Sequence, residues 1–291
     1  MSEDGKINYI PLSELQIGET IYDIGFSQTR EARYQGRPVV LKTARRGRTK
    51  KDTNLSSEAI HQEAEILRRL HHPGIVQLIG QLEPREKELP SIILEYIDGR
   101  TFEEVLNEGG FGNIELVLSV FSILAKTVAY CHHLGIVHRD IRPANIILSP
   151  TLPILIDFGI SQFPESDTCN FEYLSPENCY PQSTIGPESD VFSLATTVYF
   201  GFTGEHPVLQ SYSELKKDEY AVRKALKKNR PMIPLEERIR GLPNGLPKII
   251  ASMLRYDPLR RPTMTNVACS LGLITRKNVS LKTAQYSLTY G

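Results

Sequence analysis

The sequence predicts an α+β fold in which a β-rich amino-terminal part precedes a larger, mainly helical part. Up to residue 96, short apolar runs separated by turn residues are typical of β-strands, and one helical pattern interrupts them. After the Asp98-Gly99 pair the apolar spacing becomes mainly helical. Strands gathered in one part and helices in the other favour an α+β class over alternating βαβ units.

The expected strands lie in three stretches of the first part. Residues 16–42 alternate in a way that predicts antiparallel strands, with tight turns around Gly25 and residues 35–38. Strand-like apolar runs return at 75–82 and 91–96.

The expected helices follow the periodicity of their apolar residues. One helix is expected at 53–70, within the β-rich part. In the second part, helices are expected at 101–108, 114–134, 188–203, 213–228 and 245–255. At 291 residues the chain is long enough for one domain or for two lobes that share a cleft.

Composition excludes several classes of function. Lysine plus arginine equals aspartate plus glutamate, at 34 each, so no global field favours a nucleic acid or a membrane surface as partner. The first residues lack the apolar segment of a signal peptide. The most apolar stretch, 116–125, is too short and too interrupted by polar residues to span a bilayer, and we interpret it as part of a buried helix.

Cysteine and histidine spacing predicts neither a disulfide framework nor a zinc site. The cysteines show no C-x-x-C spacing, which favours a reduced, cytoplasmic protein; they lie at positions 131, 169, 179 and 269. The histidine pairs at 71–72 and 132–133 lack metal-ligand spacing, and we interpret them as surface or packing residues.

Residues 137–159 hold the most informative pattern in the chain. Val-His-Arg-Asp-Ile-Arg-Pro-Ala-Asn occupies 137–145, and Asp-Phe-Gly occupies 157–159. Short apolar runs at 146–148 and 154–156 predict a hairpin, whose outer ends bring Asn145 and Asp157 to one small volume. Amide and carboxylate oxygens aimed at one point suit Mg²⁺ held together with substrate phosphates.

These motifs resemble the catalytic loop and the metal-binding Asp-Phe-Gly of protein kinases. The resemblance implies a bilobal kinase-like fold, with a small antiparallel β lobe containing one helix and a larger helical lobe. It assigns residues 1–15 to a leader, 16–97 to the first lobe, 98–273 to the second and 274–291 to a tail. It also implies ATP and Mg²⁺ as cofactors and Ser/Thr-containing proteins as substrates.

The resemblance implies a role for each catalytic candidate. Lys42 takes the place of the strand lysine that contacts the α- and β-phosphates. Glu63 lies on the apolar face of its expected helix, where a carboxylate needs a partner, and Lys42 is the expected one. Asp140 is the candidate base, and Arg142 keeps a positive charge near the transferred phosphate. Asn145 and Asp157 are the candidate metal ligands.

Three further residues take structural positions of the family. Glu177 follows Ser-Pro at the end of the activation segment, and Arg261 falls where the family's buried arginine pairs with that glutamate. Asp190 opens an apolar helix, where a carboxylate meets unpaired amides and the positive end of the helix dipole. The resemblance implies that this aspartate braces the catalytic loop.

The adenine site is expected at the link between the lobes. In the segment 94–97, Leu94 is the expected gatekeeper, and the backbone carbonyl of Glu95 and amide of Ile97 would meet the base edge. Val40 and Ile147 would lie on either side of the ring. The same residues are also consistent with ordinary core packing.

The phosphate loop departs from the family pattern. Tyr22, Ile24 and Ser27 stand at the three glycine positions, and Gly25 lies between them. Because glycine lets backbone amides approach phosphates closely, we predict weaker ATP binding or slower turnover. The alternative is that Gly25 and a slightly shifted turn suffice.

Two further functions are consistent with the same motifs. One is a pseudokinase that acts as a scaffold, and the other is a small-molecule phosphotransferase of related fold. Pro143 and the run at 172–174 resemble serine/threonine rather than tyrosine kinases.

Ser166 is a candidate phosphorylation site. Six basic residues within 42–51 form either a docking patch or, as we favour, a solvated loop.

Overall fold

The computed structural model describes two compact units. One unit holds the described residues up to Asp98 together with Asp157–Gly159, and the other holds Gly99–Ile156 and the described residues from Phe171 onward. The described residues are 7–86, 88–159, 171–180, 185–208, 224, 226–227 and 232–278.

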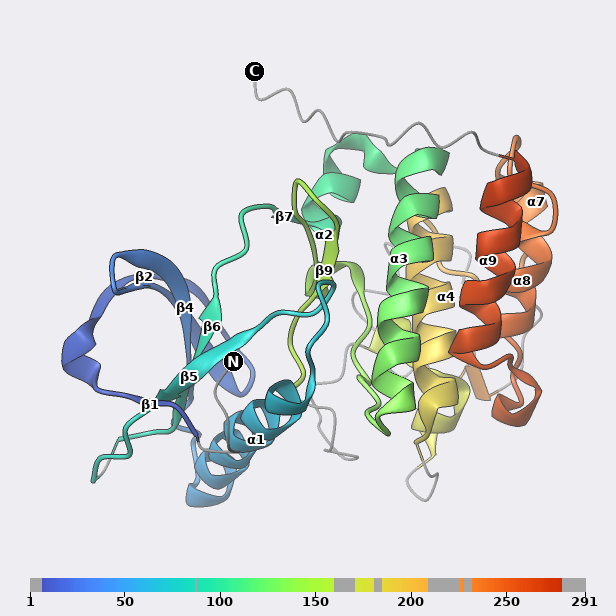
Figure 1. The fold of residues 1–291 in the computed structure, drawn as a ribbon. Coiled ribbons are helices and arrows are strands. Elements are labelled where there is room, and N and C mark those ends of the chain that lie inside the picture. Colours follow the sequence, from blue (N-terminus) through green and yellow to red (C-terminus); the bar gives the residue numbers. More distant parts are fainter. Residues whose placement is uncertain are drawn as a thin grey trace. The chain divides into compact units, whose positions relative to one another are not determined.

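The first unit is built on a sheet that is six-stranded within the described residues. Its strands lie in the order β1-β5-β6-β4-β3-β2 (Figure 1). Their bounds are β1 Tyr9–Ile10, β2 Leu15–Ile24, β3 Ser27–Tyr34, β4 Arg37–Ala44, β5 Leu78–Leu82 and β6 Ser91–Glu95. All neighbouring strands are antiparallel except β1, which runs parallel to β5. The antiparallel strands expected at 16–42 are therefore present.

Strand β1 extends the sheet into the stretch that was interpreted as a leader. The amide of Gln81 donates to the carbonyl oxygen of Asn8 at 2.9 Å, and the amide of Glu83 donates to that of Ile10 at 3.1 Å. A Cβ atom at Gly80 would lie 2.6 Å from the Asn8 oxygen, so only glycine lets β1 approach β5 this closely. The fold thus begins well before residue 16.

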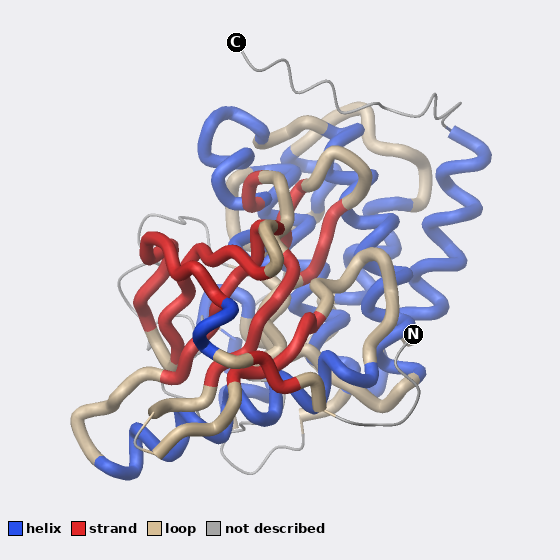
Figure 2. The backbone as a smooth tube through the Cα atoms, turned by 60° about the vertical axis from the view of Figure 1, so that its left-hand side comes forward, coloured by secondary structure: helices blue, strands red, loops and turns tan. Residues whose placement is uncertain are grey.

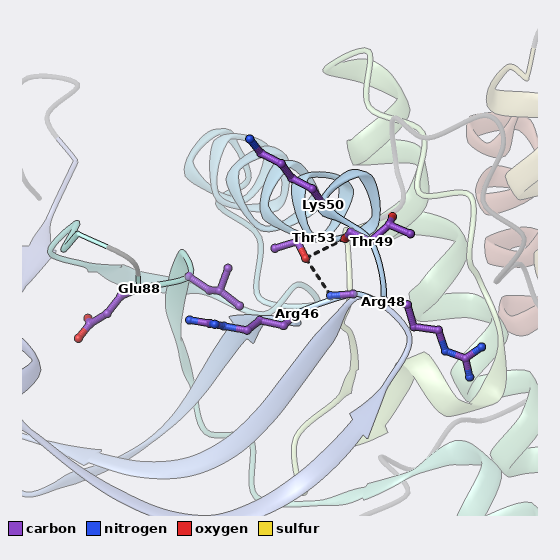
Figure 3. A pocket seen from close by; sticks show the side chains of 8 residues that line it. Arg46, Arg48, Thr49, Lys50, Thr53 and Glu88 are labelled. Carbon is purple, nitrogen blue, oxygen red and sulfur yellow. Dashed lines mark hydrogen bonds between the residues drawn. The ribbon is translucent and has the colours of Figure 1, made fainter.

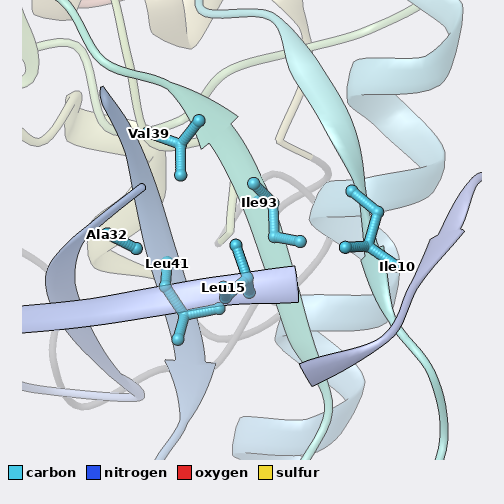
Figure 4. Close-up of a cluster of buried hydrophobic side chains, with 6 residues drawn as sticks. All are labelled: Ile10, Leu15, Ala32, Val39, Leu41 and Ile93. Carbon is cyan, nitrogen blue, oxygen red and sulfur yellow. The ribbon is translucent and has the colours of Figure 1, made fainter. Parts of the chain in front are cut away.

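A cluster of buried aliphatic side chains holds the sheet together (Figure 4). Strand alternation sends Val39 and Leu41 of β4 to one face, where they meet Ile93 of β6. Ile10 of β1 and Leu15 of β2 complete the cluster, and both lie far from Ile93 in the sequence. Each of these side chains is at most 8% exposed, so the cluster is a core of the unit.

The helix α1, Lys50–Arg69, packs on strands β4, β5 and β6. Thr49 caps its start: the amide of Asp52 donates to the Thr49 hydroxyl, and the Asp52 carboxylate accepts from the Thr49 amide. The expected helix at 53–70 therefore begins one turn earlier. Its buried face includes Ile60, Ile66 and the carboxylate of Glu63, as the 3.6-residue period predicts.

The second unit is mainly helical (Figures 1 and 2). Its long helices α3, α4 and α9 lie side by side, with α3 in contact with both others. The bounds are α2 Phe102–Val105, α3 Ile114–His133, α4 Pro187–Thr203, α7 Leu235–Arg238, α8 Leu246–Met253 and α9 Met264–Asn278. Most of the helix expected at 213–228 lies outside the described residues. Helix α9 was not predicted.

Helix α3 is long and apolar enough to cross a membrane by length and composition alone. Half of that stretch is buried inside the unit, and core helices of soluble proteins pass the same test. Its buried residues, such as Phe121, Leu124 and Val128, face the other helices. This burial agrees with the buried helix expected around 116–125, whereas the expectation that the apolar stretch is too short to span a bilayer is wrong by length.

A short sheet of strands β7, β8 and β9 carries the informative motif. Strands β8, Ile146–Leu148, and β9, Pro153–Leu155, form the expected hairpin, and β7, Arg100–Thr101, pairs with β8. Ile146 pairs with Leu155, so the second strand lies one residue earlier than expected.

Candidate active site

A partly buried ion cluster in the first unit joins three charged residues from different segments. The Lys42 ammonium on β4 lies 2.9 and 2.7 Å from the two carboxylate oxygens of Glu63 on α1. It also lies 2.9 Å from Oδ1 of Asp157. An ammonium has three N–H donors, and here each meets a carboxylate oxygen. The pair of Lys42 and Glu63 that the sequence led us to expect is present.

Burial sets the electrostatics of this cluster. Glu63 is fully buried, and desolvation raises its pKa even though Lys42 opposes the shift. For Lys42, burial alone would lower the pKa, but the carboxylates of Asp157 and Glu63 outweigh it and raise the pKa. One cation faces two carboxylates, so the cluster carries an excess negative charge when all three groups are ionised.

The backbone around Asp157 is fixed in an unusual conformation. Asp157 has a φ of 64°, in the left-handed region that non-glycine residues rarely adopt. The amide of Phe158 donates to Glu63 at 3.3 Å, and the amide of Gly159 donates to Oδ1 of Asp157 at 3.2 Å. A Cβ at Gly159 would lie 3.2 Å from oxygens of both Asp157 and Glu63, so glycine suits this crowded position.

In the second unit, Asp140 is held by two side chains of its own loop. Its Oδ2 accepts from the Asn145 amide at 2.7 Å and from Nε of Arg142 at 3.3 Å. Among the described residues, no hydrogen bond to Oδ1 is present. One carboxylate oxygen is thus held by two hydrogen bonds, and within the described residues the other makes none.

Asp190 at the start of α4 supports the backbone of this loop. Its carboxylate is fully buried and accepts from the amides of His138 and Arg139, both at 2.8 Å. Burial alone would raise the Asp190 pKa, but the hydrogen bond from His132 and the nearby charges lower it. Arg139 has a φ of 69°, a strained conformation that these bonds maintain.

His132 is a residue whose role the sequence pattern did not reveal. We interpreted it as a surface or packing residue, but its Nε2 lies 2.8 Å from Oδ2 of Asp190. A signal was present in the sequence, because a carboxylate at the start of an apolar helix needs partners when it is buried. The histidine pairs were assessed only for metal-ligand spacing, which does not reveal a histidine that partners a buried carboxylate.

His138 links the loop to the end of the hairpin. Its Nδ1 accepts from the Asp140 amide at 3.2 Å, so Nε2 must carry the proton that is donated to the Ile156 carbonyl at 3.1 Å. The Ile156 amide in turn donates to the carbonyl of Asn145 at 3.0 Å. Asp157 is the next residue along the chain.

Asn145 of the second unit and Asp157 of the first each carry an oxygen donor of the kind that suits a hard cation such as Mg²⁺. Both amide hydrogens of Asn145 are used, since Nδ2 donates to the backbone oxygen and to Oδ2 of Asp140. Its side-chain oxygen is therefore the group left to act as a ligand. The Asp157 carboxylate is 42% exposed. Amide and carboxylate oxygens are the ligands that Mg²⁺ prefers.

The residues expected around adenine lie on strands of both sheets. Val40 on β4 pairs with the buried Leu94 on β6, and Glu95 ends that strand. The Glu95 side chain accepts from the amide of Gln77 at 2.8 Å and is thereby turned to β5. Ile147 is the partly buried central residue of β8. Ile97 follows β6, and its role stays a prediction.

The expected phosphate loop is a tight hairpin turn. Ile24, the last residue of β2, pairs with Ser27, the first of β3, so only Gly25 and Phe26 form the turn. Gly25 has a φ of 69°, which explains a glycine here. Tyr22 is paired within the ladder with Thr29. The three positions where the family has glycine therefore belong to paired strand segments.

Glu177 and Arg261 form the expected buried pair. Nη1 of Arg261 donates to Oε1 of Glu177 at 2.7 Å, and Nη2 donates to Oε2 at 2.8 Å, a bidentate geometry. The Arg261 side chain is fully buried, so the pair anchors the segment after residue 171 to the start of α9. Ser166, the candidate phosphorylation site, lies outside the described residues.

Three residues of the basic run, Arg46, Arg48 and Lys50, line one part of a hollow of about 480 Å³ at the start of α1, and Glu88 and Leu89 line another (Figure 3). The amide of Gly47 donates to the hydroxyl of Thr53 at 3.0 Å, and both residues line the hollow. Arg46, Arg48 and Lys50 point in different directions and do not converge on one point. Their side chains are exposed, which is consistent with the solvated loop that we favoured.

The sequence is similar to those of known protein kinases. A family model described as the protein kinase domain matches residues 21–271. The serine/threonine-protein kinase PknB of Mycobacterium tuberculosis (strain H37Rv) is 30% identical over 220 residues, which cover 69% of this chain and 33% of that protein. PknB of Mycobacterium leprae is 28% identical over 218 residues, with the same coverage.

A mammalian relative is similar to the same extent. Sperm motility kinase 2B of Mus musculus is 28% identical over 198 residues, which cover 65% of this chain and 39% of that protein. The matches span only about a third of PknB and about two fifths of the mouse kinase.

Proposed function

The chain belongs to the protein kinase domain family, and from that premise we propose that it transfers the γ-phosphate of ATP to serine or threonine hydroxyls of proteins, with Mg²⁺ as cofactor. The relatives named as serine/threonine-protein kinases support this specificity. Pro143 and the run at 172–174 point the same way.

The cluster of the buried Lys42 and Glu63 with the partly exposed Asp157 carries the proposal. A buried ion pair contributes little net stability, because desolvation of both charges offsets their attraction. A cluster with an excess negative charge is less favourable still, so stability does not explain it. Such a group of perturbed charges suits a site that receives a cation together with phosphates.

The first unit would bind and orient the triphosphate. Lys42 donates to phosphate oxygens, and Glu63 holds the lysine in that position through two short hydrogen bonds. Asp157 and Asn145 would hold Mg²⁺, which supplies charge neutralisation for the phosphates when bound. Backbone groups of Gly25, Glu95 and Ile97, and the side chain of Val40, would complete the nucleotide contacts.

The second unit would activate the acceptor hydroxyl. Asp140, with its Oδ2 fixed by Asn145, would accept the hydroxyl proton or orient the hydroxyl through Oδ1. Arg142, 3.3 Å from that carboxylate, places a positive charge beside it. Ile147 on β8 would contact the adenine ring.

A pseudokinase is the second candidate, and one observation favours it. All three N–H donors of Lys42 already meet carboxylate oxygens, so a phosphate must displace one of them. The tight turn at Gly25 adds the expectation of weak nucleotide binding. A module that binds nucleotide only for regulation would not need to transfer phosphate, so weak nucleotide binding is compatible with this role.

Phosphoryl transfer separates the two candidates. We expect the purified chain, with Mg²⁺ and labelled ATP, to label a generic protein substrate on serine or threonine, and Asp140→Asn to abolish the label. Asp140→Asn should keep nucleotide binding, because Asp140 is not among the proposed phosphate ligands. Nucleotide-dependent thermal stabilisation without label transfer in the wild type would instead support the pseudokinase.

A further inference from the structure

The turn between β2 and β3 is tied to the end of β4 by a network that the family pattern does not predict. Nε of Arg45 lies 3.0 Å from Oδ1 of Asp23, and Nε2 of Gln28 donates to Oδ2 of Asp23 at 3.1 Å. The amide of Arg45 donates to the carbonyl oxygen of Phe26 at 2.9 Å. Arg45 therefore holds both the strand end before the turn and the tip of the turn.

Arg45 acts on the turn and not on the phosphates directly. Side chains alternate along a strand, so Arg45 continues the face opposite to Lys42 and Ala44 at the end of β4. Exposure agrees with this placement, because the Lys42 side chain is 9% exposed and that of Arg45 is 40% exposed. The Lys42 ammonium contacts Glu63 and Asp157, while the Arg45 side chain is partly exposed and contacts Asp23.

Without the family's glycines, this turn gives up close approach to the phosphates but has less conformational freedom to lose on binding. A glycine-rich loop gains close approach of its amides to phosphates, but it loses more conformational freedom when it becomes ordered. In this chain paired strand residues reach to Ile24 and Ser27. A turn that is already fixed in its bound conformation avoids part of the ordering cost on binding.

We propose that Asp23, Arg45 and Gln28 form a positioning network that fixes the turn of Gly25 and Phe26 for the nucleotide phosphates. This inference rests on the proposed function, since it assumes that the turn covers ATP. Arg45 also neutralises the Asp23 carboxylate, which would otherwise repel the triphosphate. Fixed turn geometry thus replaces the glycines that are missing.

The decisive variant removes the ion pair without changing the net charge. We expect Asp23→Asn/Arg45→Gln in the full chain to weaken binding of Mg-ADP by about two- to fivefold, the range for a solvent-exposed ion pair. Adenosine, which has no phosphates, should bind with unchanged affinity. A purely structural loss would weaken both ligands, so the ratio of the two dissociation constants is the readout.

Rescue and salt dependence complete the test. The reversed pair, Asp23→Arg/Arg45→Asp, should restore Mg-ADP affinity to within about twofold of the wild type. Because exposed charges are screened, the difference between the wild type and the neutral double variant should shrink at about 1 M NaCl. The matched control is Glu65→Gln/Arg68→Gln, which removes an exposed pair of 3.0 Å on α1 and should leave both affinities unchanged.

The outcomes of this test are distinct. An unchanged Mg-ADP affinity in the neutral double variant, an equal loss for adenosine, or a reversed pair without rescue would each overturn the inference. A wild type that binds neither ligand would instead overturn the proposed function.

Discussion

Acidification is expected to destabilise the second unit through His206, a buried histidine away from the proposed chemistry. Its Nδ1 accepts from the amide of Val208 at 3.1 Å, so the proton lies on Nε2 and is donated to the Glu172 carbonyl at 2.9 Å. The bond from Val208 requires the neutral imidazole, because a protonated Nδ1 cannot accept a hydrogen bond. Burial lowers the pKa of His206 to about 4, and the bond to Glu172 offsets only part of this shift.

The sign and size of the effect follow from proton linkage. The folded-state pKa lies below the unfolded value of 6.5, so the unfolded chain takes up the proton first as the pH falls. Stability is complete above pH 6.5 and is lost progressively down to about pH 4. The gap between 6.5 and about 4 corresponds to about 3 kcal/mol in total, of which about 2 kcal/mol is lost between about pH 7 and about pH 5.

Urea unfolding at neutral pH and at about pH 5 measures this loss against two variants. His206→Gln cannot titrate, so its change in unfolding free energy between the two pH values should be about 2 kcal/mol smaller than that of the wild type. The exposed His71→Gln should follow the wild type. If His206→Gln showed the same change with pH as the wild type, the buried neutral histidine would not be the cause.

Three further substitutions test separate parts of the structure. Arg261→Ala should lower the free energy of unfolding, measured with urea, by about 3–5 kcal/mol, because it leaves the Glu177 carboxylate unpaired. The control Arg260→Ala, at an exposed side chain, should change it by less than about 0.5 kcal/mol. Gly80→Ala should displace β1 and speed hydrogen exchange of the amides that β5 donates to it, with exchange in α3 unchanged. Lys42→Met should slow phosphoryl transfer at least about a hundredfold in the labelled-ATP assay; a rate near wild type would remove this lysine from the mechanism.

Local periodicity predicted the features that one segment determines alone. Glu63 lies among apolar residues at helical spacing, so its burial and its need for a cation followed from the residue spacing. The hairpin of β8 and β9 was equally visible, because two apolar runs flank a short turn. The second strand was placed one residue too late, since Pro153 begins the strand and does not belong to the turn.

Features that depend on distant partners were not predictable in this way. Strand β1 has only two residues, too few for any period, and it exists because Gly80 leaves room beside β5. His132 gains its role from Asp190, which lies 58 residues further along the chain. Helix α9 does have a local signal, since the hydroxyl of Thr263 caps it after Pro262, although no helix was predicted there.

Strand β1 also bears on where this domain can be cut. The family match begins at residue 21, in the middle of β2. A truncated protein that started there would lose both Ile10 and Leu15 from the core cluster of the first unit. It would also leave the backbone of β5 unpaired along an open sheet edge, a template for association with another chain. Soluble expression of the kinase domain therefore calls for a start before Asn8.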